Sequence, residues 1–411
     1  MSSEWKTVSA SEYCLIVTDG THDSPKQTNE GHYLVTSKHL SKYSIDFESA
    51  YLISSEDYSK VIERSKVDQW DILFSMIGTI GRLYQEKFPN PNYAIKNVGL
   101  FKLGGDIKKS NWLIYYLQSP NANQYILSHL RGSTQSYISL KSLRDMPVSI
   151  PPTSIQNKIV SILSSIDEKI ELNNKINDNL EQMAQAIFKN QFVDFEPFKN
   201  GKFVESELGL IPEGWKVDML ENTCKFLSSG GTPSTKNSNY YAGDIKWFST
   251  KELNDNFLIN SEKHITLDAI ANSSAKLFPK GTVLMAIYAA PTVGRLGILC
   301  DDSTFNQATV GLDVKENVGL YFIYLTLLNQ REKLNNLANG AAQQNLNVSI
   351  VKKYKILVPN ESILIDFNNL IKPIFSQIEN LQLQNDQLKK KRDLLLPKLM
   401  SGETDVSQVE I

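Results

Sequence analysis

Short polar segments that recur in both halves of the 411-residue chain carry the side chains best suited to chemistry. Thr36-Ser37-Lys38 corresponds to Ser249-Thr250-Lys251, and Arg82 and Arg295 each end a Thr-x-Gly-Arg sequence. Serine, threonine, lysine and arginine bind phosphate oxygens, and lysine and arginine also hydrogen-bond base edges. If the ligand is a nucleic acid, the candidate contacts are Ser37, Lys38, Thr250, Lys251, Arg82 and Arg295. Two alternatives remain open: exposed turns without a ligand for the loops, and structural salt bridges for the arginines.

A second pair of polar segments differs between the halves. Thr21-His22-Asp23-Ser24 stands opposite Thr232-Pro233-Ser234-Thr235. Side chains that read different bases must lie where the halves differ, whereas matching residues are better suited to scaffold or phosphate contacts. Thr21, His22, Thr232 and Ser234 are therefore candidate base-reading positions.

Catalytic and metal-binding patterns are not found in the sequence. The one Gly-Lys pair, Gly201-Lys202, has no glycine five residues earlier and is followed by phenylalanine, which excludes a Walker loop. An Asn/Asp/Ser-Pro-Pro-aromatic tetrapeptide, which would mark an adenine-methylating centre, does not occur. His22-Asp23 is the nearest approach to a reactive pair, and the three cysteines are far apart. We expect no catalytic residue, no metal site and no cofactor bound by this chain, so that partners supply any chemistry.

The polar segments must be positioned by a structural unit that the chain uses twice. Seven residues between Gly132 and Ile170 recur at a constant offset of 208 residues, and shorter matches upstream recur at offsets of 210 to 213. A fixed period indicates one supersecondary arrangement repeated, and so two similar surfaces. The seven pairs are Gly132/Gly340, Gln135/Gln343, Pro151/Pro359, Ser154/Ser362, Ile155/Ile363, Ile166/Ile374 and Ile170/Ile378.

Within each half, β-rich runs at 71–77 and 281–287 predict strands. Spaced aromatic and leucine residues predict one closing helix over 112–130 and one over 320–337. The predicted fold class is α+β.

A long helix with one apolar stripe is predicted after each variable region, because apolar residues recur in steps of three and four. Asn173, Asn177 and Asn385 fall on the stripes, as register-setting polar residues do in coiled coils. Pro373 is expected to bend the second helix. The Lys389–Arg392 run is expected to be a solvated face, or else to meet an acidic surface or DNA backbone. The predicted interface residues are Ile159, Ile162, Ile166, Ile170, Leu180, Ile187, Phe367, Leu370, Ile374, Ile378, Leu388 and Leu395.

Two arrangements of the stripes are possible: packing of the two helices on each other, antiparallel, or docking of each stripe on its own domain. We favour the antiparallel pair, which places two pseudo-symmetric domains apart. The predicted segments are domain 1 (1–150), helix 1 (151–195), a linker (196–212), domain 2 (213–358), helix 2 (359–400) and a tail (401–411).

Composition places this fold in a soluble class. Hydrophobic residues make up 41% of the chain, but no apolar stretch approaches the roughly 20 residues that span a bilayer. The N-terminal sequence lacks the profile of a signal peptide, so we expect a cytoplasmic protein without a membrane partner. With a net charge of −2, a nucleic-acid ligand would require the basic residues to gather on one face.

Taken in order, these elements resemble the specificity (S) subunit of type I DNA restriction–modification systems over essentially the full length. The matching residues are Gly-Trp-Lys-Val (214–217), Gly-Gly-Thr-Pro-Ser (230–234), Asp-Gly-Thr-His (19–22), the Gly-x-x-Gln turns (132–135 and 340–343) and Ile-Pro-Pro-x-x-x-Gln (150–156). The second half departs from the last pattern, since Pro359-Asn360 replaces Pro-Pro and Leu364 replaces the glutamine.

The resemblance implies two target-recognition domains held apart by two antiparallel helices, each reading half of a bipartite, asymmetric site in double-stranded DNA. It implies as partners two modification (methyltransferase) subunits and restriction (endonuclease and translocase) subunits, with S-adenosylmethionine, ATP and Mg on those partners. Two alternatives stay open: a coiled-coil scaffold whose end domains bind protein, and a recognition subunit of a lone methyltransferase without a nuclease.

Overall fold

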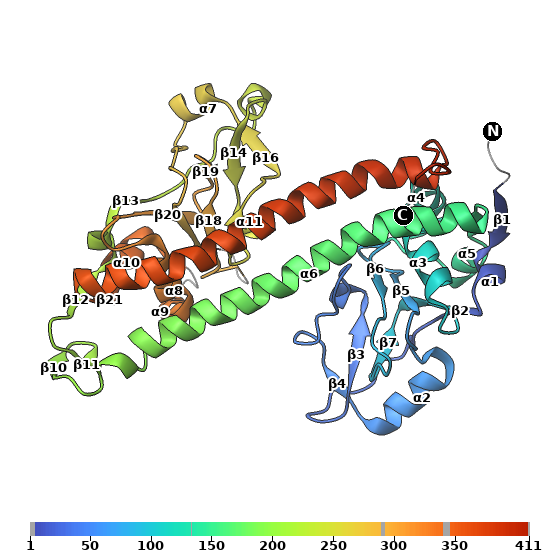
Figure 1. Ribbon diagram of the computed structural model, residues 1–411, viewed down its shortest axis with the longest axis horizontal. Coiled ribbons are helices and arrows are strands. Elements are labelled where there is room, and N and C mark those ends of the chain that lie inside the picture. Colours follow the sequence, from blue (N-terminus) through green and yellow to red (C-terminus); the bar gives the residue numbers. More distant parts are fainter. Residues whose placement is uncertain (1–4, 133, 289–291, 340–345, 410–411) are drawn as a thin grey trace. The chain divides into compact units, whose positions relative to one another are not determined.

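The computed structural model describes residues 5–132, 134–288, 292–339 and 346–409, and it divides into two compact units (Figure 1). Unit 1 comprises Met1–Glu171 and Gln387–Ile411, and unit 2 comprises Leu172–Asp386. Two helices of 40 residues each, α6 (Thr153–Phe192) and α11 (Glu361–Met400), contribute to both units. The second Gly-x-x-Gln turn, at 340–343, lies outside the described residues.

Unit 1 is built on three small sheets, ordered β1-β9, β2-β8-β5-β6 and β4-β3-β7. All pairs are antiparallel except β3 with β7, which is parallel. The strands are β1 (Lys6–Ser9), β2 (Ile16–Asp19), β3 (His32–Thr36), β4 (Leu52–Ile53), β5 (Ile72–Ser75), β6 (Leu83–Gln85), β7 (Tyr93–Lys96), β8 (Val98–Lys102) and β9 (Pro147–Ile150). The short helices are α1 (Ala10–Tyr13), η1 (Ser37–His39), α2 (Ser55–Ser65), α3 (Ile107–Tyr116), α4 (Pro120–Ser128) and α5 (Leu140–Arg144).

Unit 2 contains sheets ordered β12-β21, β13-β20-β17-β18-β15 and β16-β14-β19, and a separate hairpin β10-β11. Its strands are β10 (Phe203–Ser206), β11 (Gly209–Pro212), β12 (Lys216–Met219), β13 (Cys224–Ser229), β14 (Ile245–Phe248), β15 (Asn256–Leu258), β16 (Lys263–Ile265), β17 (Val283–Ala286), β18 (Leu296–Leu299), β19 (Thr304–Phe305), β20 (Thr309–Val314) and β21 (Lys355–Val358). Its helices are η2 (Glu196–Phe198), η3 (Leu220–Thr223), η4 (Ser238–Tyr241), η5 (Thr250–Glu252), α7 (Leu267–Ala271), α8 (Leu320–Asn329), α9 (Arg331–Asn339) and α10 (Val348–Lys353).

The two units share one topology, which confirms the predicted repeat and the α+β class. The pair β1-β9 corresponds to β12-β21, and β2-β8-β5-β6 corresponds to β13-β20-β17-β18. The third sheet corresponds strand for strand, because β14 pairs in parallel with β19 as β3 does with β7. Strand β15 and the β10-β11 hairpin are additions in unit 2.

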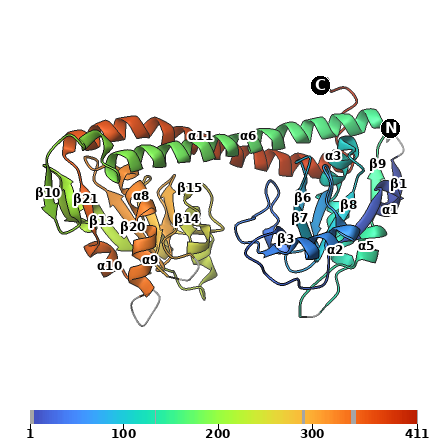
Figure 2. The same ribbon diagram turned by 90° about the horizontal axis from the view of Figure 1, so that it is seen from below.

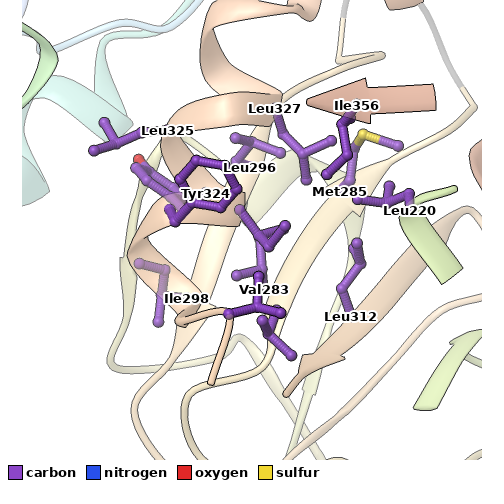
Figure 3. Close-up of a cluster of buried hydrophobic side chains, with 14 of the residues drawn as sticks. Leu220, Val283, Met285, Leu296, Ile298, Leu312, Tyr324, Leu325, Leu327 and Ile356 are labelled. Atoms are coloured by element: carbon purple, nitrogen blue, oxygen red, sulfur yellow. The ribbon is translucent and has the colours of Figure 1, made fainter. Parts of the chain in front are cut away.

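Each unit closes its core by packing helices against the central sheet. In unit 2, Val283, Leu296 and Leu312 from three neighbouring strands meet Tyr324 and Leu327 of α8 (Figure 3). The runs predicted as strands at 71–77 and 281–287 contain β5 and β17, whose residues are all buried. Buried strands need no polar alternation, which explains why these runs are continuously apolar.

The prediction of one closing helix in each half is wrong, because two helices occupy each segment. In unit 1 the chain leaves α3 after Tyr116, and Ser119 caps a new helix whose first residue is Pro120. Ser119 has an extended backbone that ends the preceding turn, and Pro120, which has no N–H to donate, is suited to the first position of a new helix. In unit 2 the break falls at Gln330, between α8 and α9.

Helices α6 and α11 pack antiparallel, as predicted. In unit 2 the Phe192 and Phe367 rings lie 4.8 Å apart, and Asn173 hydrogen-bonds Asn385 at the other end of this contact. Residue numbers thus rise along one helix as they fall along its partner. Figure 2 shows the two long helices in this arrangement. Helix α11 continues through Pro373 without a break.

The predicted stripes are correct in place but shifted by one residue at several positions. Ile159, Ile166, Ile170, Phe367 and Ile378 are buried as expected. Leu370 is 50% exposed, and its neighbour Ile371 is buried instead. The cause is that apolar residues stand side by side at these points, so that spacing alone does not fix the phase. Ile162, Leu180, Ile187, Ile374, Leu388 and Leu395 are partly buried, while Leu163, Ala184, Phe188, Phe192, Phe375 and Leu396 are fully buried.

A layer of amides interrupts the apolar seam, as predicted. Asn173, which is fully buried, donates from Nδ2 to Gln384 Oε1 (2.7 Å) and Asn385 Oδ1 (2.9 Å). Asn385 in turn donates to Asn174 Oδ1 (2.8 Å). Asn177 is also buried. If one helix slipped along the other, these amides would lie among apolar groups without hydrogen-bond partners. The layer therefore favours one register.

We predict that Asn173→Ala lowers the melting temperature of the protein. The substitution leaves the buried Asn385 Oδ1 without its donor, which costs about 1–3 kcal/mol. Replacing both Asn173 and Asn385 by leucine removes the polar pair and should restore much of the stability. Asn190→Ala, at an exposed position of α6, is the matched control. Thermal melting followed by circular dichroism measures all three, and an Asn173→Ala variant that melts with the wild type would refute the role of the layer.

The stability of unit 2 should also depend on pH through Glu181 of α6. Burial, with Asp178 and Asp255 nearby, raises the pKa of Glu181 from 4.5 to about 7. A carboxyl whose folded pKa is raised contributes stability that is present below pH 4.5 and lost as the pH rises through about 7. Glu181→Gln should therefore raise the melting temperature at pH 8 and change it little at pH 4.5. Glu168→Gln, on an exposed position of the same helix, provides the control. An equal effect of Glu181→Gln at both pH values would contradict the assignment.

Candidate nucleic-acid interface

A cavity of about 430 Å³ in unit 1 collects three of the sequence-predicted residues. Its cationic side chains are Lys38, Arg82 and Lys96, and none of the described residues that line it is a carboxylate. A concave surface with several cations and no acid attracts anions such as phosphate. The lining consists of Thr36, Ser37, Lys38, Ile77, Gly78, Thr79, Arg82, Lys96, Asn97 and Gln135.

The parallel strands β3 and β7 bring the first part of this lining together. Thr36 is paired with Lys96 at the ends of the two strands, so the residues that follow leave the sheet at the same edge. Ser37 begins η1, and its hydroxyl donates to the Asn97 carbonyl at 3.3 Å. The Thr36 N–H donates to Nδ1 of the buried His39 at 2.9 Å, which closes the turn beneath Lys38.

A glycine turn after β5 positions Arg82. Ser75 Oγ donates to the Thr79 carbonyl at 2.6 Å and accepts the Arg82 N–H at 2.7 Å. Gly81 has φ +86°, a left-handed conformation that side-chain-bearing residues rarely adopt. Arg82 Nη1 then donates to the Lys38 carbonyl at 3.4 Å. Among the residues that the structure describes, no carboxylate pairs with Arg82, which favours a ligand contact over the salt-bridge alternative.

The Gly-x-x-Gln turn in unit 1 reaches the same cavity. Gly132 has φ +90°, and a Cβ there would lie 2.4 Å from the Gln135 carbonyl oxygen, so only glycine fits. Gln135 itself lies in the lining of the cavity. The sequence comparison found this turn but did not indicate that it faces the loop of Lys38.

The segment that follows β2 does not line the cavity itself but contacts Asn97, which does. His22 Nε2 lies 3.1 Å from the carboxylate of buried Asp19, to which Arg64 also binds. His22 Nδ1 lies 2.8 Å from Asn97 Oδ1. Thr21 uses its hydroxyl to accept the Asp23 N–H at 3.1 Å, so its side chain shapes the turn. Of the two candidates in this segment, His22 is the more accessible, with 64% of its side chain exposed.

A partly buried ionic cluster attaches the segment after η1 to the long helices within unit 1. Asp167 of α6 accepts from Tyr43 (2.9 Å) and Arg392 of α11 (3.0 Å), and it lies 3.1 Å from Lys42 Nζ. Burial raises the pKa of Asp167, but Lys42 and Arg392 outweigh that effect and bring the pKa below its usual value. The expectation of a solvated face is therefore wrong at Arg392, whose side chain is 12% exposed. No sequence pattern indicated this cluster, because its members are far apart in the chain.

The candidates in unit 2 are less available than those in unit 1. Thr250, the first residue of η5, is buried at 9% exposure, so little of its side chain is accessible to a ligand. Lys251 is exposed but forms an ion pair with Glu262. Arg295 Nη1 donates to Asn254 Oδ1 at 3.2 Å, and the described residues give it no carboxylate partner. Ser234 is exposed.

The structure corrects the alignment of the two variable segments by one residue. The Thr21 N–H donates to the Ile95 carbonyl, and the Gly231 N–H donates to the Phe305 carbonyl. Ile95 and Phe305 occupy the same point of the fold, since each pairs with the residue before the matched Thr36 and Ser249. Thr21 therefore corresponds to Gly231, and His22 corresponds to Thr232. Thr232 Oγ1 donates to Gln307 Oε1, as His22 meets Asn97.

Two site residues, Asn97 and Gln307, were missed by the sequence comparison. Each lies two positions beyond Ile95 or Phe305, just before the matched Val-Gly-Leu patches. The offset between the halves changes there from 210 to 212, so the alignment breaks at these residues. The parallel pairing of β3 with β7 and of β14 with β19 identifies these two residues as equivalent, and that pairing is seen only in the structure.

Other kinds of site find no support in the described part of the chain. No group of three histidine, cysteine or carboxylate residues is placed to hold a metal ion there. The described helices are all too short or too polar to cross a bilayer. Cys14, Cys224 and Cys300 are buried, and burial raises the pKa of each thiol, to about 12, 11 and 12. Buried thiols of this kind are unreactive.

Known proteins show the same organisation. The model of the type I restriction modification DNA specificity domain matches residues 2–182 and again 212–392. The chain is 31% identical over 343 residues to the type I restriction enzyme MjaIX specificity subunit of Methanocaldococcus jannaschii, covering 82% of this chain and 78% of that protein. It is 25% identical over 405 residues to the HindI specificity subunit of Haemophilus influenzae, covering 83% and 88%.

A solved structure agrees on the fold. The type I restriction–modification S subunit from M. genitalium superimposes with a TM-score of 0.57 at 12% identity, covering 96% of both chains. Two copies of one topology, two antiparallel helices that contribute to both units, and a double match to the specificity-domain model are thus found in one polypeptide. The chain belongs to the family of type I restriction–modification specificity subunits.

Proposed function

We propose that this subunit reads a bipartite, asymmetric site in double-stranded DNA, with unit 1 contacting one half-site and unit 2 the other. The observation that carries the proposal is the cavity of unit 1, in which Lys38, Arg82 and Lys96 gather without a carboxylate. In a chain of net charge −2, that local excess of positive charge is what a DNA ligand requires. The shared topology of unit 2 supplies a second, non-identical surface.

The contacts divide by chemistry. Lys38 and Arg82 lie at turns set by the backbone and suit phosphate oxygens, which fix the register of the protein on the duplex. The surfaces that differ between the units, around His22 and around Thr232, suit base edges in the major groove. Specificity subunits of type I systems are non-catalytic, so the role of this chain is recognition and assembly.

The partners follow from that role. Specificity subunits of type I systems assemble with modification and restriction subunits. For this chain we propose two modification subunits, one for each repeat, in the cytoplasm of the host. S-adenosylmethionine, ATP and Mg would then be held by those partners and none by this chain. The exposed apolar residues of the long helices, Leu172, Met183, Ile365, Leu370 and Leu394, offer surface for such partners.

The test is to express the full chain with its modification partner and to determine the methylated sequences of the host genome. We expect a motif of two specific halves separated by unread bases. Exchanging residues 1–150 for those of another family member should alter one half only, since unit 1 supplies that half. A continuous motif, or a swap that changes both halves while the protein remains folded, would contradict the assignment of one half-site to each unit.

We predict that Lys38→Ala and Arg82→Ala each weaken DNA binding by a similar factor for cognate and non-cognate duplexes. Each lost phosphate contact should reduce the slope of log affinity against log salt concentration by about 0.9. Lys60→Ala is the matched control, because Lys60 is exposed on α2, paired with Glu56, and outside the cavity. Affinity is measured by fluorescence anisotropy across a salt series. Unchanged slopes for Lys38→Ala and Arg82→Ala would exclude both residues from the phosphate contacts.

A further inference from the structure

Each unit holds one amide side chain at the same point of the fold. Asn97 and Gln307 lie two residues beyond Ile95 and Phe305, whose carbonyls accept equivalent backbone hydrogen bonds from Thr21 and Gly231. The segment after β2 or β13 then contacts the amide oxygen, through His22 in unit 1 and Thr232 in unit 2. Thr232 donates its hydroxyl to the oxygen, and His22 donates to it in the form that carries a proton on Nδ1. Both contacts leave the amide nitrogen unused.

Both amide nitrogens are available to a ligand. Among the residues that the structure describes, neither Asn97 Nδ2 nor Gln307 Nε2 has a hydrogen-bond partner. Gln307 is exposed, and Asn97 is partly exposed and lines the cavity that contains Lys38, Arg82 and Lys96. The contact through the oxygen is enough to close the loop. The free nitrogen of Asn97 lies at the cavity of Lys38, Arg82 and Lys96, where a ligand could accept from it.

The backbone at Asn97 is held in an uncommon conformation. Its φ is +52°, a left-handed value that costs roughly 1–2 kcal/mol for most residues and less for asparagine. The Asn97 N–H donates to the Thr21 carbonyl at 3.1 Å, and the Asn97 carbonyl accepts from Ser37 Oγ at 3.3 Å. With both backbone groups and the side-chain oxygen engaged, the direction of the remaining N–H₂ group is fixed. Backbone strain that the surroundings maintain is characteristic of functional positions.

We propose that Asn97 and Gln307 are the specificity-determining residues of the two half-sites, each donating its amide N–H₂ to an acceptor on the major-groove edge. This inference rests on the proposed function and assigns the readers within it. The acceptors that such a donor meets are O6 or N7 of guanine, N7 of adenine and O4 of thymine. Because the oxygen is occupied, the amide cannot make the bidentate contact that asparagine and glutamine otherwise make with adenine. His22 and Thr232 are then positioning residues, which hold the amide but need not touch a base.

The sharpest test replaces the donor while keeping the shape. Asn97→Asp and Gln307→Glu retain an oxygen for His22 and Thr232 and replace N–H₂ by an acceptor. We expect the preferred base at one position to change to one that presents a donor, cytosine N4 or adenine N6. The change should be confined to one half-site for Asn97→Asp and to the other for Gln307→Glu. Preferences are measured by selecting from a pool of random duplexes with the full chain and its modification partner.

Asn92→Asp is a matched control for added charge and for loss of the amide. Asn92 also meets a histidine, since its Oδ1 lies 2.8 Å from His32 Nδ1, but it lies outside the cavity. Asn97→Gly is the second variant, because glycine accepts the positive φ without strain and removes the side chain. We expect Asn97→Gly to lose most of the preference at that one base pair, about tenfold or more, while other positions keep theirs.

The outcomes separate the two levels of the proposal. If the wild-type complex selects no bipartite site, the proposed function fails before the amides are tested. If the wild type selects its site and both Asn97→Asp and Asn97→Gly select the same bases, the assignment of Asn97 is overturned. Variants that lower the affinity for all duplexes equally, or lower only the melting temperature, would show that the amide is a loop support. The pair in unit 2 is tested independently by Gln307→Glu in the same selection.

Discussion

The burial of the stripes on α6 and α11 is the constraint on which the rest of the structure depends. A 40-residue helix with one apolar face is unstable in water until that face is covered. Within unit 2 the C-terminal part of α6 meets the N-terminal part of α11, where Phe188 and Phe192 surround Phe367. The same aromatic group extends to Phe322 of α8. The helices therefore complete the core of the recognition fold and are not a separate body attached to it.

This integration explains why compact units and sequence segments do not coincide. Ile159 and Leu163 of α6, with Leu396 and Leu399 of α11, belong to the same buried cluster as Trp112 of unit 1. A boundary drawn at residue 150 would separate the sheet from part of its own core. The polar layer at Asn173 and Asn385 then has a defined task, since it selects one register of two helices whose apolar residues alone would permit several.

The two copies of the repeat use different side-chain contacts at equivalent positions of their long helices. Asp167 in unit 1 and Phe375 in unit 2 are 208 residues apart and so occupy equivalent positions on the two helices. Asp167 holds Tyr43 and Arg392 in a partly buried ionic cluster. Phe375 instead stacks on Tyr321 with ring centroids 4.3 Å apart. An ion pair needs every charge satisfied when it is buried, whereas an aromatic contact requires only shape, so the two solutions tolerate mutation differently.

Local patterns predicted the regular parts of this protein, and non-local pairing decided the rest. The repeat, the buried strands β5 and β17, the long helices and their amide layer all leave periodic or repeated signals in the chain. The phase of the stripe near Leu370 and Ile371 was ambiguous because adjacent apolar residues fit both readings. The burial of Thr250 depends on which way a three-residue turn faces the sheet, which no short motif encodes.

The residues of the candidate site also fall into those that local patterns predict and those that depend on non-local pairing. Lys38 and Arg82 were found because matching glycine and hydroxyl residues surround them in both halves. Asn97 and Gln307 were not found, since they are defined by the parallel pairing of β3 with β7 and of β14 with β19. Sequence comparison rewards identity between the halves. A residue that distinguishes two half-sites must differ between them, so the comparison passes over it for that reason.

Backbone hydrogen bonds next to Asn97 and Gln307 explain how the base preference of such a site can change while the fold is kept. The bonds from Thr21 to Ile95 and from Gly231 to Phe305 run between backbone groups and do not depend on side-chain identity. His22 and Thr232 differ in size and chemistry, yet each engages the amide oxygen of the residue opposite. A substitution at the reading position therefore alters the group presented to DNA while the strands, the turn and the cations keep their places. The fold is conserved in its backbone pairing, and specificity resides in side chains that this pairing holds at the surface.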